Sequence, residues 1–366
     1  QQIVSGRFEP GSMLPKWDEM EELFSAGRPT LMKAMAQLKK DGYIEATRSK
    51  GTFVHMRPPH LNRFGLVFPS HPTISHTGLS RWNNFWELLS RLSQVIADEF
   101  DLEIPVYYNI GNYIGTDEKK LEKDVARHLI GGIIVAAADT VQHKLLQSTT
   151  IPRVLISAET VSLGTPSIYV DRKSFVRGAM DIMHQQNRKR IAVITDRFFA
   201  FSLKGQPSVD DTWARPASYH SVSMDFYKQM QNEGFESKPH WHLMLTPCAA
   251  RPVSRLLFDR PESERPDGII ISDDNLTDEV IAGMLDAGIS STNCPIIVNH
   301  CNWPVQHTSM LPTIGLGYDV RDLLRCCLGT ILALQRSRSV PPFQQLKAQK
   351  GPSPVTPEQG PALLSD

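Results

Sequence analysis

Residues 27–44 have the sequence GRPTLMKAMAQLKKDGYI, and this segment determines how the N-terminal part of the chain folds. Proline is favoured in the first turn of a helix because its missing N–H would have no partner there, so Arg28-Pro29-Thr30 predicts a helix start. Apolar residues then recur at helical spacing, at Leu31, Ala34, Met35 and Leu38. Asp41-Gly42 predicts the end of this helix near Lys39.

The flanking residues predict the partners of this helix. Upstream, Leu14-Pro15 introduces a short helical candidate over Lys16–Phe24, and residues 25–27 form a tight connection to the next helix. Downstream, Tyr43–Ala46 and Thr52–Val54 are typical of a hairpin around the turn at residues 48–51. The first fifty-odd residues therefore predict two helices followed by a β-hairpin.

Charge is concentrated in this region, although the whole chain is balanced. The 366 residues carry 39 basic and 39 acidic side chains. Between Arg28 and Arg57, however, seven basic residues stand against two acidic ones, a local net charge of +5. A helix start adds partial positive charge of its own, so this surface suits phosphate groups.

Four motifs in order resemble the GntR-family winged helix-turn-helix: residues 6–15 (GRFEPGSMLP), 27–30 (GRPT), 37–44 (QLKKDGYI) and 50–54 (KGTFV). The resemblance covers residues 1–54 as one DNA-binding domain, and it places the start of the family's first helix before Gln1. It implies that Arg28, Pro29, Thr30 and Lys33 lie in the first turns of the recognition helix. It also implies that the wing tip contains Arg48, Lys50, Gly51 and Thr52. Gly27 stands where the family usually has serine.

Residues 55–63 predict a short extended linker, because Pro58 and Pro59 disfavour helix. Beyond the linker, apolar strand candidates alternate with amphipathic helix candidates, which predicts a mostly parallel α/β sheet with helices on both faces. The predicted strands are Phe64–Phe68, Ile104–Tyr108, Gly132–Ala136, Arg153–Ser157, Ile168–Val170, Ile191–Thr195, Gly268–Ser272 and Ile296–Asn299. The predicted helices are Trp82–Glu99, Glu118–Leu129, Ser174–Gln185, Ser221–Glu233, Leu276–Ala287 and Val320–Arg336.

Residues 64–350 resemble the LacI-type, periplasmic-binding-protein-like (type I) effector domain. The segments that carry the resemblance are 151–156 (IPRVLI), 168–171 (IYVD), 187–194 (NRKRIAVI), 266–274 (PDGIIISDD) and 312–315 (PTIG). The resemblance implies two lobes around a ligand cleft. We expect lobe one to comprise residues 62–187 and 313–336, and lobe two residues 188–311 and 337–350. Residues 351–366, rich in proline, predict a flexible tail.

Ligands in such folds bind beyond the carboxyl ends of strands. The resemblance therefore implies effector contacts from Ser70, His71, Asp171, Arg172 and Asp273. The aromatic rings of Trp82, Phe85 and Trp86 are candidates for stacking on a ligand or, alternatively, for core packing. The family's sugar-binding arginine falls at Val222, with Arg215 nearby. Its carboxylate falls at Cys301, beside Asn302. Arginine and carboxylate are good partners for hydroxyls, so their loss argues against an ordinary sugar and leaves three alternatives: an unusual saccharide, another metabolite, or no effector.

The sequence thus predicts a cytoplasmic transcription regulator, either repressor or activator, that binds a double-stranded DNA operator as a homodimer and responds to a small molecule such as a sugar. No run of residues is apolar enough for a membrane span, and the five cysteines have no metal-ligand spacing. The sequence predicts no metal, no cofactor and no enzymatic activity, since no nucleophile elbow or phosphate-binding loop is present. The alternative is a solute-binding sensor whose winged helix no longer binds DNA.

Overall fold

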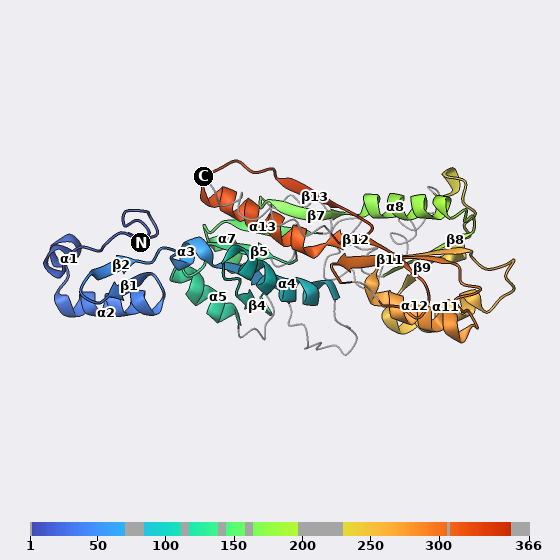
Figure 1. Ribbon diagram of the computed structural model, residues 1–366, viewed down its shortest axis with the longest axis horizontal. Helices are drawn as coiled ribbons and strands as arrows, with labels where there is room; N and C mark the ends of the chain where they lie inside the picture. Colours follow the sequence, from blue (N-terminus) through green and yellow to red (C-terminus); the bar gives the residue numbers. More distant parts are fainter. Residues whose placement is uncertain are drawn as a thin grey trace.

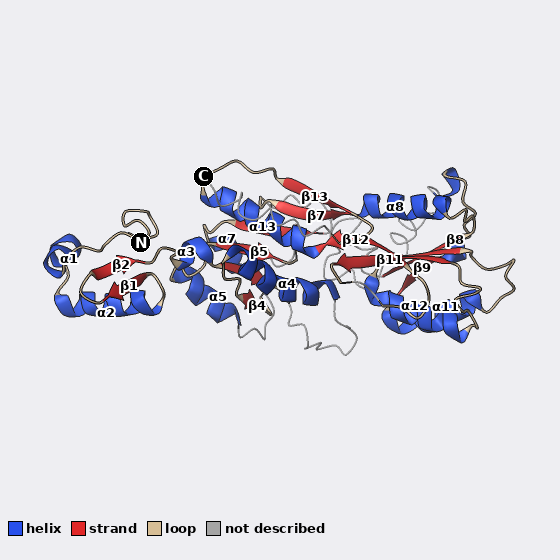
Figure 2. Cartoon of the chain, viewed as in Figure 1, coloured by secondary structure: helices blue, strands red, loops and turns tan. Residues whose placement is uncertain are grey.

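The computed structural model describes residues 2–69, 84–110, 117–137, 144–157, 164–196, 230–305 and 308–352. The chain forms an elongated molecule in which a small N-terminal unit, a first α/β lobe and a second α/β lobe follow one another along the long axis (Figure 1). Helices flank the sheets of both lobes (Figure 2). The predicted fold class, a helix-turn-helix unit joined to two parallel α/β lobes, is confirmed.

The N-terminal unit contains the predicted two helices and hairpin. Helix α1 spans Trp17–Phe24 and α2 spans Arg28–Lys40. Strands β1 (Ile44–Thr47) and β2 (Gly51–Val54) pair antiparallel, with Ile44 opposite Val54. The apolar face of α2 is only partly covered, because it borders a cavity of about 360 Å³. We call residues 2–54 the winged helix.

Two glycines allow the sharp turns of the winged helix. Gly42 follows the C-cap of α2 with a φ of +80°, and the Tyr43 N–H then donates to the Leu38 carbonyl, which closes the helix end. Gly51 has a φ of +120° after the hairpin turn, a conformation that residues with a side chain rarely adopt. The predicted positions of the helix stop and of the hairpin turn are therefore explained by backbone conformation.

The linker differs from the extended segment that we predicted. Residues Pro59–Asn62 form the short helix α3, and both Pro58 and Pro59 are buried. Pro59 occupies the first turn of this helix, where a proline costs no hydrogen bond, so the proline pair starts a helical turn instead of preventing one.

Lobe one is built on a six-stranded, fully parallel sheet with the order β13-β7-β6-β5-β3-β4. Its strands are β3 (Phe64–Val67), β4 (Val106–Tyr107), β5 (Gly132–Val135), β6 (Arg153–Ser157), β7 (Ser167–Asp171) and β13 (Phe343–Lys347). Its helices are α4 (Asn84–Phe100), α5 (Asp117–Ala126), α7 (Lys144–Ser148) and α13 (Val320–Gln335).

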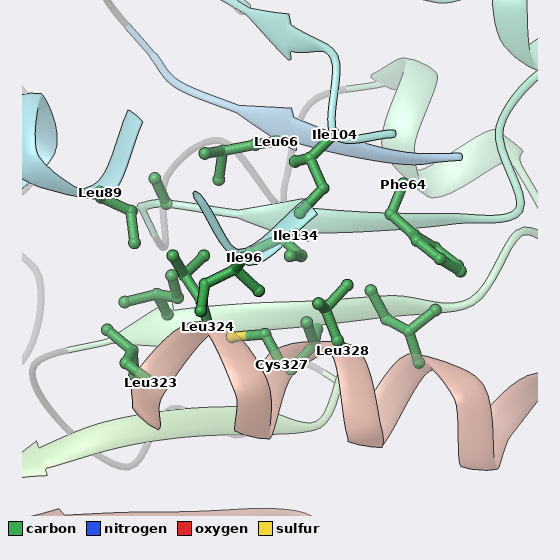
Figure 3. Close-up of a cluster of buried hydrophobic side chains, with 14 of the residues drawn as sticks. Phe64, Leu66, Leu89, Ile96, Ile104, Ile134, Leu323, Leu324, Cys327 and Leu328 are labelled. Carbon is green, nitrogen blue, oxygen red and sulfur yellow. The ribbon is translucent and has the colours of Figure 1, made fainter. Parts of the chain in front are cut away.

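Successive residues of each strand in lobe one face opposite layers. In β5, Ile134 packs with α4 and α13, whereas Ile133 and Val135 pack with the cluster that includes Leu121 of α5. Figure 3 shows the first layer, with Leu324 and Leu328 of α13 lying against the sheet beside Ile96 of α4. Because both faces are covered at the centre of the sheet, β3 and β5 are continuous apolar runs.

Lobe two repeats this arrangement on a five-stranded parallel sheet with the order β12-β11-β10-β8-β9. The strands are β8 (Ile191–Asp196), β9 (His242–Leu245), β10 (Gly268–Ile271), β11 (Ile296–Trp303) and β12 (Ile314–Asp319), with the 3₁₀ turn η2 (Pro239–Trp241) before β9. In β10, Ile269 and Ile271 face helices α11 (Pro247–Phe258) and α12 (Asp274–Asp286), and Ile270 faces α8 (Arg172–Gln185).

Helix α8, which we placed in lobe one, packs on the sheet of lobe two, and two strands also lie in the opposite lobe from our expectation. Strand β12, which we placed in lobe one, pairs with β11 of lobe two, and β13, which we placed in lobe two, pairs with β7 of lobe one. A strand at the edge of a sheet has unpaired backbone N–H and C=O groups. Strand β12 pairs with those of β11, and β13 pairs with those of β7. Strand β9 and helix α11 were not predicted. The predicted helix Ser221–Glu233 lies mostly outside the described residues, as does the predicted tail beyond residue 352.

Candidate functional site

The winged helix exposes a basic surface at the start of α2 and at the turn between β1 and β2. Seven of the eight predicted DNA-contacting residues are exposed, and Thr52 is half-buried; the exposed ones are Arg28, Pro29, Thr30, Lys33, Arg48, Lys50 and Gly51. The first turn of α2 holds no acidic residue, so the partial positive charge of the helix start is not neutralised within the helix.

Arg28 is held in place by helix α1. Its guanidinium lies 5.5 Å from the centroid of the Trp17 ring and 3.8 Å from the Asp18 carboxylate. The Asp18 side chain is 92% exposed, so this ion pair is weak. The Trp17 ring therefore restrains the direction of Arg28 while leaving its outer edge accessible.

The winged helix packs directly on lobe one. Leu129, in the turn between α5 and β5, is buried in the same apolar cluster as Ile44 and Val54 of the hairpin. The Tyr43 hydroxyl donates a hydrogen bond to the His128 carbonyl of this turn. Lobe one thus supplies part of the winged-helix core, and we call residues 127–131 the docking turn.

An ion pair joins the end of α2 to the docking turn. The Arg127 guanidinium contacts the carboxylate of Asp41, the C-cap residue of α2, whose side chain is only 10% exposed. Gln37 also donates to Asp41, at 2.8 Å. Nearby, Tyr43 stacks on His60 with ring centroids 5.8 Å apart. The orientation of α2 relative to lobe one is therefore defined by specific contacts.

A second candidate site lies between the two lobes. A cavity of about 230 Å³, here called the aromatic chamber, is lined by rings from both lobes and by polar groups at strand ends. The rings are those of Phe85, Trp86, Phe175 and Tyr318; the polar groups include Ser157, Arg172, Ser272, Asp273, Asp274, Asn275, His300 and Asn302. A cavity that combines aromatic rings with converging polar groups suits a small polar molecule.

Two adjacent carboxylates lie in different electrostatic environments in this cavity. Burial and the neighbouring Asp274 raise the pKa of Asp273, whose Oδ1 accepts from the Asn275 N–H at 2.8 Å as an N-cap of α12. Burial would also raise the pKa of Asp274, but its interactions with His300, Asn302 and Asn84 outweigh burial and lower it. Asp274 therefore keeps its negative charge, held by the Asn302 amide at 2.9 Å and by His300 at 3.8 Å.

Of the residues predicted for effector binding, Phe85, Trp86, Arg172, Asp273 and Asn302 come together in the aromatic chamber. Cys301 is buried and lines a neighbouring cavity with Asn302. Ser70, His71, Trp82 and Arg215 lie outside the described residues.

Asp171 lies at the end of β7, between Val170 and Arg172, which both line the chamber. It is absent from the chamber lining, its carboxylate accepts from the Ser174 N–H as the N-cap of α8, and its carbonyl accepts from the Tyr318 hydroxyl at 2.9 Å. Sequence reasoning missed Asp274, His300 and Tyr318. The signal for Asp274 was available in the sequence, because it follows Asp273 at the end of the same strand, whereas His300 and Tyr318 depend on the register of β11 and β12.

Within the described residues, no helix has the length and apolar character that a membrane span requires. Within the same ranges, no group of three or more His, Cys, Asp and Glu side chains is arranged to share a metal ion.

Comparison with known proteins matches residues 1–54 to the bacterial regulatory proteins of the gntR family. The chain is 30% identical over 105 residues to the HTH-type transcriptional regulator TreR of Bacillus subtilis, a match that spans 29% of this chain and 39% of TreR. It is 21% identical over 301 residues to the arabinose metabolism transcriptional repressor of Geobacillus stearothermophilus, covering 79% of this chain and 75% of that protein.

Solved structures resemble the remainder of the chain. A LacI-family transcriptional regulator from Lactobacillus casei with bound glucose has a TM-score of 0.53 at 16% identity, and the match covers 78% of this chain and 97% of that one. At this identity the likeness concerns the fold. The chain therefore joins a GntR-like helix-turn-helix region to a domain with the LacI-type fold.

Proposed function

We propose that this protein is a DNA-binding transcriptional regulator whose affinity for its operator is controlled by a small molecule bound between the lobes. One observation carries the proposal: the unit with the exposed basic surface shares its core with the lobe that lines the cavity, through Leu129. A ligand that alters lobe one can therefore act on the position of α2. The TreR and arabinose-repressor matches, both to transcriptional regulators, support this reading over an enzymatic one.

The start of α2 and the hairpin turn have different roles in DNA recognition. Arg28 can present two donors to guanine in the major groove, whereas Lys33, Arg48 and Lys50 provide charge for phosphates. Because one winged helix reads only a short half-site, we propose that the protein acts as a homodimer on a two-fold symmetric operator. We place this activity in the cytoplasm, where DNA is accessible.

The effector is a hydroxyl-bearing compound such as a sugar. Carboxylate, amide and guanidinium groups are suitable partners for hydroxyls, and aromatic rings suit the apolar face of a sugar ring. The position of the family's carboxylate is taken by Cys301, which lines the neighbouring cavity, whereas Asp273 and Asp274 bring two carboxylates to the aromatic chamber from α12 and its N-cap. The loss of a carboxylate at position 301 therefore leaves the cavity suited to hydroxyls.

Two measurements test the proposal. Duplexes selected from a random pool by the full chain are used in gel-shift titrations against an unselected duplex at two salt concentrations. A thermal-shift screen with sugars identifies the effector, which is then added to the gel-shift assay. We expect tighter binding to the selected duplex and a change in affinity on adding the effector. Failure to select any duplex would refute the DNA-binding role and favour a sensor that does not bind DNA.

A further inference from the structure

Helix α2 carries an exposed apolar strip on its outward side. Pro29, Met32 and Ala36 are spaced three and four residues apart, so they lie next to one another on one face of the helix, and all three are exposed. Met32, the largest of the three, is 57% exposed. We call these three residues the apolar strip. It is separate from the inward face of α2, where Leu31 is buried.

Basic residues border the apolar strip on both sides. An α-helix advances about 100° per residue, so Met32 lies between Arg28, about 40° away around the helix, and Lys33, about 100° away on the other side. Helix α2 contains no acidic residue along its whole length. This layout suits a helix in the major groove of DNA, where phosphates lie on both sides and base edges form the floor.

The side chains in the middle of this helix face determine how it can read a base. Glutamine can pair with adenine through a donor and an acceptor, but the Gln37 amide donates to Asp41 at 2.8 Å, at the end of α2 that meets the docking turn. The side chains of Met32 and Ala36 carry no hydrogen-bond donor. They therefore recognise bases by apolar contact, and the apolar group that a base pair presents in the major groove is the C5 methyl group of thymine.

Met32 is the member of the apolar strip that reaches furthest from the helix. Its unbranched side chain is flexible and polarisable, whereas the side chains of Pro29 and Ala36 are short and allow the helix to approach the groove closely. Arg28 precedes Met32 by four residues, which is about 6 Å along the helix axis. Successive base pairs are about 3.4 Å apart, so the two side chains reach bases that are about two steps from each other.

We propose that Met32 is a specificity-determining residue that recognises the methyl group of a thymine in each half-site, within about two base pairs of the guanine bound by Arg28. The inference rests on the proposed function and specifies the DNA sequence that the winged helix selects. The contact removes apolar surface of the thioether and of the methyl group from water. A duplex that lacks only this methyl group keeps every phosphate contact and loses this one.

Replacement of thymine by uracil tests the proposal directly, because it removes the methyl group and leaves base pairing and phosphates unchanged. Equivalent thymines of the two half-sites of the selected duplex are replaced together, one pair at a time, and each duplex is titrated with the full chain by gel shift. We expect one pair whose replacement weakens wild-type binding about fourfold per methyl group.

Variants at position 32 then show which residue reads that methyl group. Met32→Ala should bind the thymine duplex about as weakly as the wild-type chain binds the uracil duplex, and it should no longer distinguish the two. Met32→Leu keeps an apolar side chain of similar size and should retain the preference for thymine. Because Met32 is exposed, the fold should tolerate both changes, which melting curves without DNA verify.

Met310→Ala is the matched control, because it removes a methionine that is 82% exposed from lobe two, and it should leave the preference for thymine unchanged. Equal wild-type affinity for the thymine and uracil duplexes at every position would overturn the proposal, as would a Met32→Ala chain that keeps the full preference. The DNA-binding role would stand in both cases, because the selected duplex is still bound more tightly than an unselected one. Failure to select any duplex would overturn both the role of Met32 and the DNA-binding function.

Discussion

Arg28 illustrates how a single side chain is prepared for recognition in this protein. It begins α2, and the Trp17 ring at 5.5 Å restricts where its guanidinium can point. A restrained arginine loses less conformational freedom when it binds, so its hydrogen bonds to a base edge contribute more to affinity. Lys50, exposed in the hairpin turn, has no such restraint among the contacts described, and a point charge needs none to meet a phosphate.

The two residues should therefore differ when each is replaced by alanine. Arg28→Ala should cost about 1–3 kcal/mol of binding free energy on the selected duplex and much less on random duplex. Lys50→Ala should weaken binding to both duplexes and reduce the slope of log affinity against log salt by about 1. Gel-shift titrations at several salt concentrations measure both quantities. Lys173→Ala, which removes an exposed lysine at the start of α8, is the control. Equal losses on both duplexes for both variants would contradict this division.

His60 links pH to the stability of the junction between winged helix and lobe one. Burial, and then the nearby His128, lower its pKa from 6.5 to about 4. The unfolded chain therefore takes up a proton as the pH falls below 6.5, but the folded protein does not until the pH nears 4. Stability is lost across this window as the pH falls, at up to about 1.4 kcal/mol per pH unit.

His60→Phe should reduce this loss, since phenylalanine can keep the stacking on Tyr43 and has no proton to bind. Between pH 7 and pH 5 the wild-type chain should lose up to about 2 kcal/mol more unfolding free energy than the variant. Urea unfolding at pH 7, 6 and 5 measures the difference. His242, whose pKa burial also lowers to about 4, contributes equally to both chains and cancels. Parallel pH profiles would show that His60 does not titrate in this way.

At the scale of elements, α2 has two ends with different partners. Its start faces outwards with Arg28, and its end is fixed to the docking turn through Asp41 and Arg127. The sequence predicted the extent of α2 from its proline, its apolar spacing and Asp41-Gly42. It gave no indication of the contact with Arg127, because the two partners are separated by 86 positions and only the folded chain brings them together.

Breaking this ion pair should loosen the winged helix from lobe one. Asp41→Asn and Arg127→Gln should each lower the unfolding free energy by about 1–3 kcal/mol, because a partly buried charge loses its partner. The double variant should lose less than the two single losses combined. Chemical denaturation followed by tryptophan fluorescence, together with limited proteolysis of the linker, provides the measurements. Arg251→Gln, which breaks the exposed pair with Asp286, should have a smaller effect. Strictly additive losses would show that Asp41 and Arg127 do not interact.

Other elements mark the limit of prediction from sequence. Buried strands such as β5 and β10 are evident because both faces are covered and every residue is apolar. Strand β13 alternates exposed and half-buried residues, so its pattern identifies a strand without identifying its sheet. The chain enters β13 from the end of α13, so the position of that helix determines that β13 pairs with β7. Phe85 and Asp273 could be predicted as cavity residues because they lie near the start of a helix and the end of a strand. His300 and Tyr318 could not, because their positions depend on the register of β11 and β12.

At the scale of the whole molecule, two elements of lobe one run from the cavity to the winged helix. Helix α13 begins directly after Tyr318 and Asp319, and ends at Gln335. The Gln335 amide donates to the carbonyls of His60 and Gly131, each at 2.9 Å. Strand β5 runs from the docking turn to Ala136, which lines the aromatic chamber. Figure 1 shows α13 extending along lobe one between these regions.

Gln335 should therefore be needed to transmit effector binding to the DNA-binding surface. Gln335→Ala removes the hydrogen bonds from α13 to the linker and to the docking turn. The change in DNA affinity on adding effector should therefore shrink from the usual coupling of about 1–3 kcal/mol towards zero. The affinity for the effector alone should change little. Gel shifts with and without effector, paired with calorimetry, measure the two quantities. Gln94→Ala is the matched control, because Gln94 bonds the Ile104 carbonyl within lobe one. If Gln335→Ala keeps the full effector response while Gln94→Ala loses it, the signal passes through α4 instead of α13.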